Sequence, residues 1–200
     1  QIFDQFFLFP KNLNKKILVE KPSTLNFLEI EKIDQKFDMK SIFFAEAFMY
    51  RFHPQILKVA EIIKKKEIGN ITSMKSYFGK DILSKKNIFG FKRKKKLDAN
   101  NRLFSKKLGG GAILDLGCYP VSFSIFIASL ITEGSFKEFK ILNKKKEIGT
   151  TDVDLDSYAE IKFDNNFRSQ IGASFTKNLG KKTEIIGKEG KIIIEDTWHG

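Results

Sequence analysis

The spacing of apolar residues divides the first half of the chain into strands that alternate with helices. Apolar runs of strand length and stretches with apolar residues at helical spacing follow one another in this order: strand 16–19, helix 24–37, strand 41–48, helix 53–66 and strand 71–78. Ser23 or Thr24 can cap the first helix, and Pro54 stands at a tolerated first-turn position of the second. This alternation predicts an α/β arrangement.

The second half of the chain is rich in strands around one apolar helix. Residues 79–108 form a long, basic and irregular stretch, and an almost uncharged helix is predicted at 112–131. Five further strands are predicted, at 136–142, 157–163, 168–173, 183–187 and 191–195. Hairpin turns are expected at 164–166 and 188–190. The pattern predicts an α+β domain whose mixed, mostly antiparallel sheet is covered on one face.

Composition and charge change this picture little. The hydrophobic fraction of 42% and the charged fraction of 30% are those of a soluble globular protein, and no apolar run approaches the ~20 residues of a membrane span. The net charge of +12 suggests nucleic-acid binding through basic clusters at 64–66, 92–96 and 144–146. However, 32 of the 36 basic residues are lysine, which an A/T-rich coding bias would produce. The lysine runs also fall at expected loops or helix ends, so we predict no specific nucleic-acid partner. A single cysteine, Cys118, excludes an internal disulfide.

The first candidate for chemistry is the EKP motif, Glu20-Lys21-Pro22, where the first strand ends. A residue before proline is pushed into extended geometry, so Lys21 should project rigidly from the strand end. Ligands of open α/β sheets bind outside the carboxyl ends of the strands, and a lysine there can serve proton transfer. The alternative is a surface lysine before a turn. We also predict that the Lys21–Pro22 peptide bond is cis.

The second candidate is GGGAILDLGCYP, residues 109–120. Its glycine run lets another backbone or a ligand approach closely. Asp115 and Tyr119 are four residues apart, which puts a carboxylate and a phenol on one helical face, one turn apart. The alternative is an acid favoured by the helix dipole beside a packed tyrosine. We predict that Lys21, Asp115 and Tyr119 gather around one small substrate.

Five segments carry a family resemblance, and their order spans nearly the whole chain. They are KKILVEKPSTLNFLEIEKI, EAFMYRFHPQ, EIGNITSMKSYFG, GGGAILDLGCYPVS and a weaker tail, IIGKEGKIIIED. In this order and spacing they resemble the glucose-fructose oxidoreductase / inositol dehydrogenase / MocA (Gfo/Idh/MocA) family of NAD(P)-dependent oxidoreductases. The resemblance implies that Lys21 is the active-site lysine and that Asp115 and Tyr119 complete the site. Many members carry histidine in place of Tyr119; tyrosine is more like the dihydrodiol dehydrogenase and glucose-fructose oxidoreductase branches.

The family begins with a strand, a glycine-rich phosphate loop and a helix, and no G-x-G-x-x-G motif occurs in this chain. We therefore expect a fragment that lacks the first half of the nucleotide-binding domain, with residues 1–14 as the tail of a Rossmann helix. Residues 1–50 would be the rest of that Rossmann domain, and 51–200 a C-terminally incomplete domain for substrate binding and oligomerisation. Such a truncated sheet should expose apolar surface.

The resemblance implies hydride transfer between NAD or NADP and a carbon of a sugar, polyol or cyclic diol. Lys21 would hydrogen-bond the reacting oxygen, Tyr119 would be the other acid/base candidate, and Asp115 would orient the lysine or a substrate hydroxyl. Contacts to the cofactor are predicted for Glu20, Lys21, Pro22 and Arg51, and none to a metal. Arg51 could instead pair with Glu46.

Further expectations concern partners and alternatives. His53 most simply caps or packs, and catalysis by it is the less favoured interpretation. We expect a cytoplasmic protein that acts on a small molecule, forms a homo-oligomer through its open sheet when full length, and binds no membrane. The fragment alone should be inactive. The alternative is a non-catalytic sugar- or nucleotide-binding module on a decayed copy of the fold.

Overall fold

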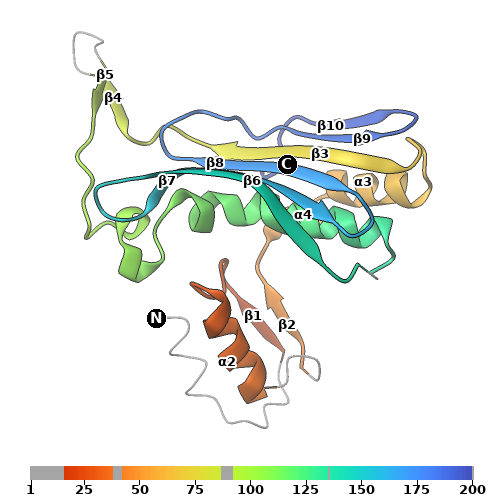
Figure 1. Ribbon diagram of the computed structural model, residues 1–200, viewed down its shortest axis with the longest axis horizontal. Helices are drawn as coiled ribbons and strands as arrows, with labels where there is room; N and C mark the ends of the chain where they lie inside the picture. The colour runs from red at the N-terminus through yellow and green to blue at the C-terminus, as the bar shows by residue number, and fades with distance from the viewer. Residues whose placement is uncertain (1–15, 38–41, 87–91, 135, 200) are drawn as a thin grey trace. The chain divides into compact units, whose positions relative to one another are not determined.

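The computed structural model describes residues 16–37, 42–86, 92–134 and 136–199, and it divides into two compact units (Figure 1). The first unit is Gln1–Met49 and the second is Tyr50–Gly200. This division falls one residue before the boundary expected from the sequence. The predicted Rossmann-helix tail at 1–14 lies outside the described residues.

The first unit is a strand–helix–strand arrangement. Strand β1 (Ile17–Val19) pairs in parallel with β2 (Phe44–Glu46), and helix α2 (Phe27–Phe37) connects them. Parallel neighbours need a crossover of this kind. Its small core contains Val19, Ile33 and Phe37, whereas Leu18, which points to the other side of β1, is 72% exposed. Apolar surface is thus exposed at Leu18. That truncation of the sheet is the cause stays a prediction.

Helix α2 begins three residues later than predicted because a different residue caps it. The side-chain oxygen of Asn26 accepts the amide hydrogen of Glu29 at 3.2 Å. The Glu29 carboxylate in turn accepts the amide of Leu25 at 2.8 Å. This arrangement is a variant of the capping box in which the carboxylate accepts the amide before the cap residue, and it replaces the predicted cap at Ser23 or Thr24.

The second unit is built on a six-stranded sheet of order β10-β9-β3-β8-β7-β6. The strands are β3 (Ile71–Gly79), β6 (Phe139–Ile148), β7 (Asp154–Phe163), β8 (Arg168–Ser174), β9 (Thr183–Gly187) and β10 (Lys191–Ile194). Only the β3–β8 pair is parallel among these neighbours. The predicted mixed, mostly antiparallel sheet is confirmed.

Two helices lie on one face of this sheet, α3 (Pro54–Lys64) and α4 (Cys118–Ile131) (Figure 1). Ser124 of α4 and Ser169 of β8 share a hydrogen bond at 2.6 Å, which fixes the side of β8 that faces the helix. Because strand residues alternate in direction, Gly172 points to the opposite face, where Tyr77 and Tyr158 flank it. A side chain at Gly172 would overlap both tyrosine rings.

The stretch 79–108 is more ordered than the sequence indicated. It contains an antiparallel pair, β4 (Ser84–Lys86) with β5 (Lys92–Lys94). Two 3₁₀ turns follow, η2 (Arg102–Phe104) and η3 (Lys106–Leu108). The prediction of an irregular stretch is wrong in these places because lysine and arginine make up most of both strands and mask their periodicity in the sequence.

Strand β6 is the second correction. It contains Lys144–Lys146, which the sequence placed in a loop or at a helix end. β6 is the edge strand of the sheet, and every one of its residues is exposed. Lysine is therefore tolerated there, and charge on an edge strand opposes unwanted pairing with another chain.

One helical stretch of the described residues, 106–131, is long and apolar enough to cross a membrane by length and composition. The expectation that no apolar run approaches that length is therefore wrong, because short helical turns continue α4 towards the N-terminus. Phe123 and Ile127 of α4 are fully inaccessible to solvent, and the helix contacts β3 and β8. A core helix of a soluble protein has these same properties.

Candidate functional site

The EKP motif lies directly after β1, in the first unit. The Lys21–Pro22 bond is cis, as predicted, and Lys21 is half-buried. The amide of Ser23 donates to the carboxylate of Glu46 at 2.8 Å, which ties the turn to the end of β2. The turn that carries Lys21 is thus held by both strands of this unit.

The glycine run after η3 brings two backbone segments together. Gly110 donates its amide hydrogen to Ser105 O, and Gly111 donates to Leu103 O, both at 2.9 Å. A Cβ atom on Gly110 would lie 2.7 Å from Leu103 O and 2.8 Å from Ser105 N. The predicted close approach is confirmed, and its partner is the backbone of residues 103–105.

Asp154, at the start of β7, caps the helical stretch from a distant part of the sequence. Its Oδ2 accepts the amide of Ile113 at 2.8 Å and the hydroxyl of Ser157 at 2.7 Å. A side chain on Gly111, which has a φ of 114°, would overlap the other carboxylate oxygen. Sequence reasoning missed this residue because nothing in a strand that starts 41 positions later indicates a helix cap.

Asp115 lies in a single π-helical turn, η4 (Ile113–Gly117), which precedes α4. The prediction of one continuous α-helix is therefore wrong in its first turn; π turns of this kind are frequent at functional sites. Arg102 Nη1 lies 3.3 Å from Asp115 Oδ1, and the aspartate side chain is 16% exposed. Asp115 thus has a specific cationic partner that the sequence reasoning did not identify.

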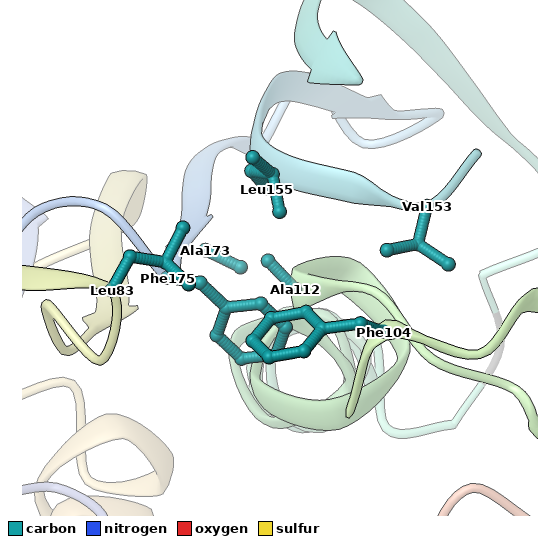
Figure 2. Close-up of a cluster of buried hydrophobic side chains, with 7 residues drawn as sticks. All are labelled: Leu83, Phe104, Ala112, Val153, Leu155, Ala173 and Phe175. Carbon is teal, nitrogen blue, oxygen red and sulfur yellow. The ribbon is translucent and has the colours of Figure 1, made fainter. Parts of the chain in front are cut away.

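The segment that carries Arg102 rests on a buried apolar cluster (Figure 2). Phe104 of η2 packs edge-on against Phe175 with ring centroids 5.9 Å apart. Figure 2 shows both rings beside Ala112, the residue that leads into η4. Because these rings are at most 8% exposed, η2 has a fixed place next to Asp115.

Tyr119 is half-buried and belongs to a group of aromatic rings on the helix-covered face of the sheet. Its ring centroid lies 5.5 Å from that of Phe78, 5.6 Å from Trp198 and 6.1 Å from Tyr50. Trp198 and Tyr50 are buried and form the base of this group, whereas the ring of His199 packs edge-on against Phe78 at 5.9 Å. Such a group offers an apolar ring surface next to the Tyr119 phenol.

Arg51, in the 3₁₀ turn η1 (Met49–Phe52), contacts α4. Its Nη2 donates to Ser122 Oγ at 2.9 Å and to the Ser122 carbonyl at 3.3 Å, and its guanidinium lies over the Phe126 ring. The neighbouring Tyr50 also donates to Ser122 Oγ, and burial raises the pKa of the Tyr50 phenol. His53 caps α3 through Nδ1, which accepts the amide of Gln55 at 3.3 Å.

The predicted site residues therefore divide between the units. Asp115, Tyr119 and Arg51 all lie at or beside the N-terminal half of the 113–131 helical stretch in the second unit. Glu20, Lys21 and Pro22 lie at the carboxyl end of β1 in the first. That Lys21 joins Asp115 and Tyr119 in one site stays a prediction, as do the cofactor contacts of Glu20, Lys21, Pro22 and Arg51.

Comparison with known proteins gives consistent matches. The family model described as the GFO/IDH/MocA C-terminal domain matches residues 56–193. The chain is 26% identical over 185 residues to a trans-1,2-dihydrobenzene-1,2-diol dehydrogenase of Xenopus tropicalis, covering 92% of this chain and 50% of that protein. It is 32% identical over 185 residues to an uncharacterised oxidoreductase of Rhizobium meliloti, covering 92% of this chain and 49% of the relative. The chain spans about half the length of the curated relatives it matches.

A solved structure shows the same fold. It is a 3-ketoreductase from Actinomadura kijaniata in complex with NADP and TDP-benzene, with a TM-score of 0.72 and 20% identity, covering 98% of this chain and 53% of that one. Structures of the same enzyme with a tyrosine replaced by phenylalanine, and with a lysine replaced by alanine, also match.

Proposed function

Because the chain belongs to the GFO/IDH/MocA family, we propose that the protein it forms part of is an NAD(P)-dependent oxidoreductase that transfers a hydride between the nicotinamide and a carbon of a sugar, polyol or cyclic diol. The relatives in this comparison include a dihydrodiol dehydrogenase, a D-xylose dehydrogenase that uses NADP and a ketoreductase. All three are named as dehydrogenases or reductases. A sugar, polyol or cyclic diol is the substrate class that these chemistries share.

The observation that carries the proposal is the environment of Tyr119. Its phenol stands on a half-exposed aromatic surface with Phe78 and is backed by buried Trp198. The flat apolar face of a sugar or diol ring fits against such rings. Asp115, which forms an ion pair with Arg102, lies on the preceding turn of the same helical stretch as Tyr119. Ring surface, phenol and carboxylate together suit a small ring that carries hydroxyl groups.

In the proposed reaction Tyr119 gives a proton to, or takes it from, the reacting oxygen, and Lys21 hydrogen-bonds that oxygen. Asp115 orients a neighbouring substrate hydroxyl. Lys21 and Tyr119 are of the same residue types as those changed in the ketoreductase variants. In this proposal the side chains of the protein transfer the proton and orient the substrate, and the cofactor carries out the redox step.

The cofactor fits the residues of this chain only in part. The carboxyl end of β1, with Glu20, Lys21 and Pro22, is where a parallel sheet holds a ligand, and the half-buried Lys21 would hold the nicotinamide end. Bound NAD or NADP would supply the hydride acceptor or donor. The sequence has no G-x-G-x-x-G turn to receive the pyrophosphate.

Partners follow from the same proposal. The face of the sheet opposite α4 carries Tyr77, Tyr158 and the Arg168–Glu160 ion pair, and we propose that it pairs with a second copy in the full-length protein. We also propose that the protein acts on a small-molecule substrate, binds no specific nucleic acid and no membrane, and is located in the cytoplasm. The alternative is a non-catalytic binding module on the same fold, and the experiments below distinguish it from an enzyme.

The decisive experiment replaces Tyr119 by phenylalanine in the full-length protein. Steady-state rates are measured with trans-1,2-dihydrobenzene-1,2-diol and with D-xylose, each with NADP⁺ and NAD⁺. Loss of a general acid/base typically lowers kcat by about 10²–10⁴-fold. Phe78→Leu is a matched control that alters the ring surface and should raise KM more than it lowers kcat. Undiminished turnover by Tyr119→Phe, or no dinucleotide binding by the wild type, would contradict the proposal.

Lys21→Ala in the same protein should lower kcat far more than it weakens dinucleotide binding, because its proposed contact is to the reacting oxygen. The 200-residue chain alone should bind NAD(P) poorly and turn over neither probe, since the pyrophosphate turn is absent from its sequence. Calorimetric titration with NADP⁺ measures the binding in both cases, and steady-state rates with the two probes measure turnover. Tight binding by the 200-residue chain would contradict the second expectation.

A further inference from the structure

The hydroxyl of Ser122 on α4 is the point where two neighbouring residues of η1 converge. Tyr50 donates its phenol hydrogen to Ser122 Oγ at 3.0 Å, and Arg51 donates to the same oxygen at 2.9 Å. Arg51 also donates to the Ser122 carbonyl at 3.3 Å. Ser122 is 7% exposed and Tyr50 is 2% exposed, so water competes little for this oxygen. One serine hydroxyl therefore ties two consecutive residues to the helix.

The guanidinium of Arg51 is held by a second contact on the same helix. Its central carbon lies 5.6 Å from the centroid of the Phe126 ring, four residues beyond Ser122. Residues four apart share one face of an α-helix, so Arg51 lies along the stripe formed by Ser122 and Phe126. This fixes η1 against α4 at a defined rotation of the helix.

Tyr50 transmits this arrangement to Tyr119. The two ring centroids are 6.1 Å apart at an angle of 43°. Tyr50 is itself held edge-on by Trp198 at 5.3 Å and by Phe123 at 5.7 Å. Tyr119 precedes Ser122 by three residues, about one helical turn. Ser122 thus influences both the helix that carries Tyr119 and the ring against which Tyr119 packs.

We propose that Ser122 is a positioning residue whose hydroxyl, by holding Tyr50 and Arg51, fixes the orientation of the Tyr119 phenol. The inference rests on the proposed function, because the orientation affects turnover only if Tyr119 acts on the substrate. Without Ser122 Oγ, the buried Tyr50 hydroxyl and the half-buried Arg51 guanidinium both lose this shared acceptor. The Tyr119 ring then loses its fixed neighbour, and small displacements of a reacting group have large effects on rate.

The test compares Ser122→Ala with Ser124→Ala in the full-length protein. Ser124 lies on the same helix and is fully buried, but its hydroxyl bonds to Pro120 O at 2.7 Å and to Ser169 of the sheet. The two variants therefore delete the same group from the same helix. Ser122→Thr keeps the hydroxyl and should therefore behave like the wild type in both readouts below. Tyr50→Phe removes one of the two donors and should show part of the change seen in Ser122→Ala.

The first readout does not require activity. In protein labelled with 3-fluorotyrosine, the ¹⁹F resonance of Tyr119 is assigned by its disappearance in Tyr119→Phe. Ser122→Ala should shift or split this resonance, whereas Ser124→Ala and Ser122→Thr should leave it in place. An unchanged Tyr119 resonance in Ser122→Ala, or an equal change in Ser124→Ala, would overturn the inference.

The second readout is turnover of the diol and xylose probes with NADP⁺. Ser122→Ala should lower kcat by about 10–100-fold with KM changed less than about threefold, since a misplacement near 1 Å costs rates of that order. Ser124→Ala should keep kcat within about twofold. If Tyr119→Phe retains full kcat, the proposed function fails; if only Ser122→Ala retains it, the inference about Ser122 fails.

Discussion

Gly110 gives the sharpest test of how the candidate site is assembled. In Gly110→Ala the added Cβ would meet three backbone atoms of the 103–105 segment, all within 2.8 Å. Backbone atoms cannot rotate away as a side chain can, so the two segments must separate. Overpacking of this kind costs typically about 1–3 kcal/mol. For a chain of 150–250 residues each kcal/mol lowers Tm by about 2–4 °C, so a decrease of about 2–12 °C is expected.

The assay is thermal unfolding followed by near-ultraviolet circular dichroism, together with urea unfolding of the same samples. Gly190→Ala is the matched control, because its Cβ would meet only the Ile68 residue, at 3.2 Å or more. That variant should keep Tm within about 2 °C. Gly110→Ala should also weaken the Arg102–Asp115 contact, because the strained segment carries Arg102. Equal melting temperatures for Gly110→Ala and wild type would refute the close backbone approach.

Two further predictions concern stability. Burial alone would raise the pKa of Asp156, but hydrogen bonds from Ser174, Thr176 and Lys177 hold it below its usual value. Because the pKa is lowered in the folded state, the carboxylate stabilises the fold at pH values above the unfolded pKa of ~3.9, and this stabilisation is lost as pH falls through the folded pKa. Asp156→Asn should therefore lower the free energy of unfolding by about 1–3 kcal/mol at pH 7 and by less in acid, as measured by urea unfolding at a series of pH values. A difference that stays constant down to pH 3 would speak against this. His53→Ala should destabilise the protein by about 1 kcal/mol through loss of the α3 cap, whereas His53→Asn should retain most of the stability; equal urea midpoints for both would contradict the capping role.

Much of the fold could be predicted because its signals are local. Strand β9 was placed at 183–187 and is found at Thr183–Gly187, since turn residues bound a short apolar run on both sides. The cis bond at Lys21–Pro22 was also predicted from the strand end and the proline. The cap of α2 was missed by two or three residues because Asn26 competes with Ser23 and Thr24, and only the position of Glu29 favours Asn26.

The site was harder to predict because its supports are remote in sequence. Asp115 and Tyr119 share one short motif, but the partners found in the structure lie elsewhere: Arg102 in an irregular stretch, Asp154 at a strand start and Trp198 near the end of the chain. Strand β6 was also hard to predict from the sequence, for a different reason. Its lysines obscure the alternation of a strand, because both sides of this edge are accessible to water.

Trp198 has a practical consequence for spectroscopy. It is the single tryptophan of the sequence, it is 1% exposed, and its indole N–H donates to Tyr77 O at 3.2 Å. Its ring lies 5.6 Å from that of Tyr119 and 5.3 Å from that of Tyr50. In the 200-residue chain, intrinsic emission excited at the red edge of the absorption band therefore comes from one fluorophore beside the candidate site. Quenching or spectral change on adding a ring-shaped alcohol would report occupancy directly, without labels and without knowing whether turnover occurs.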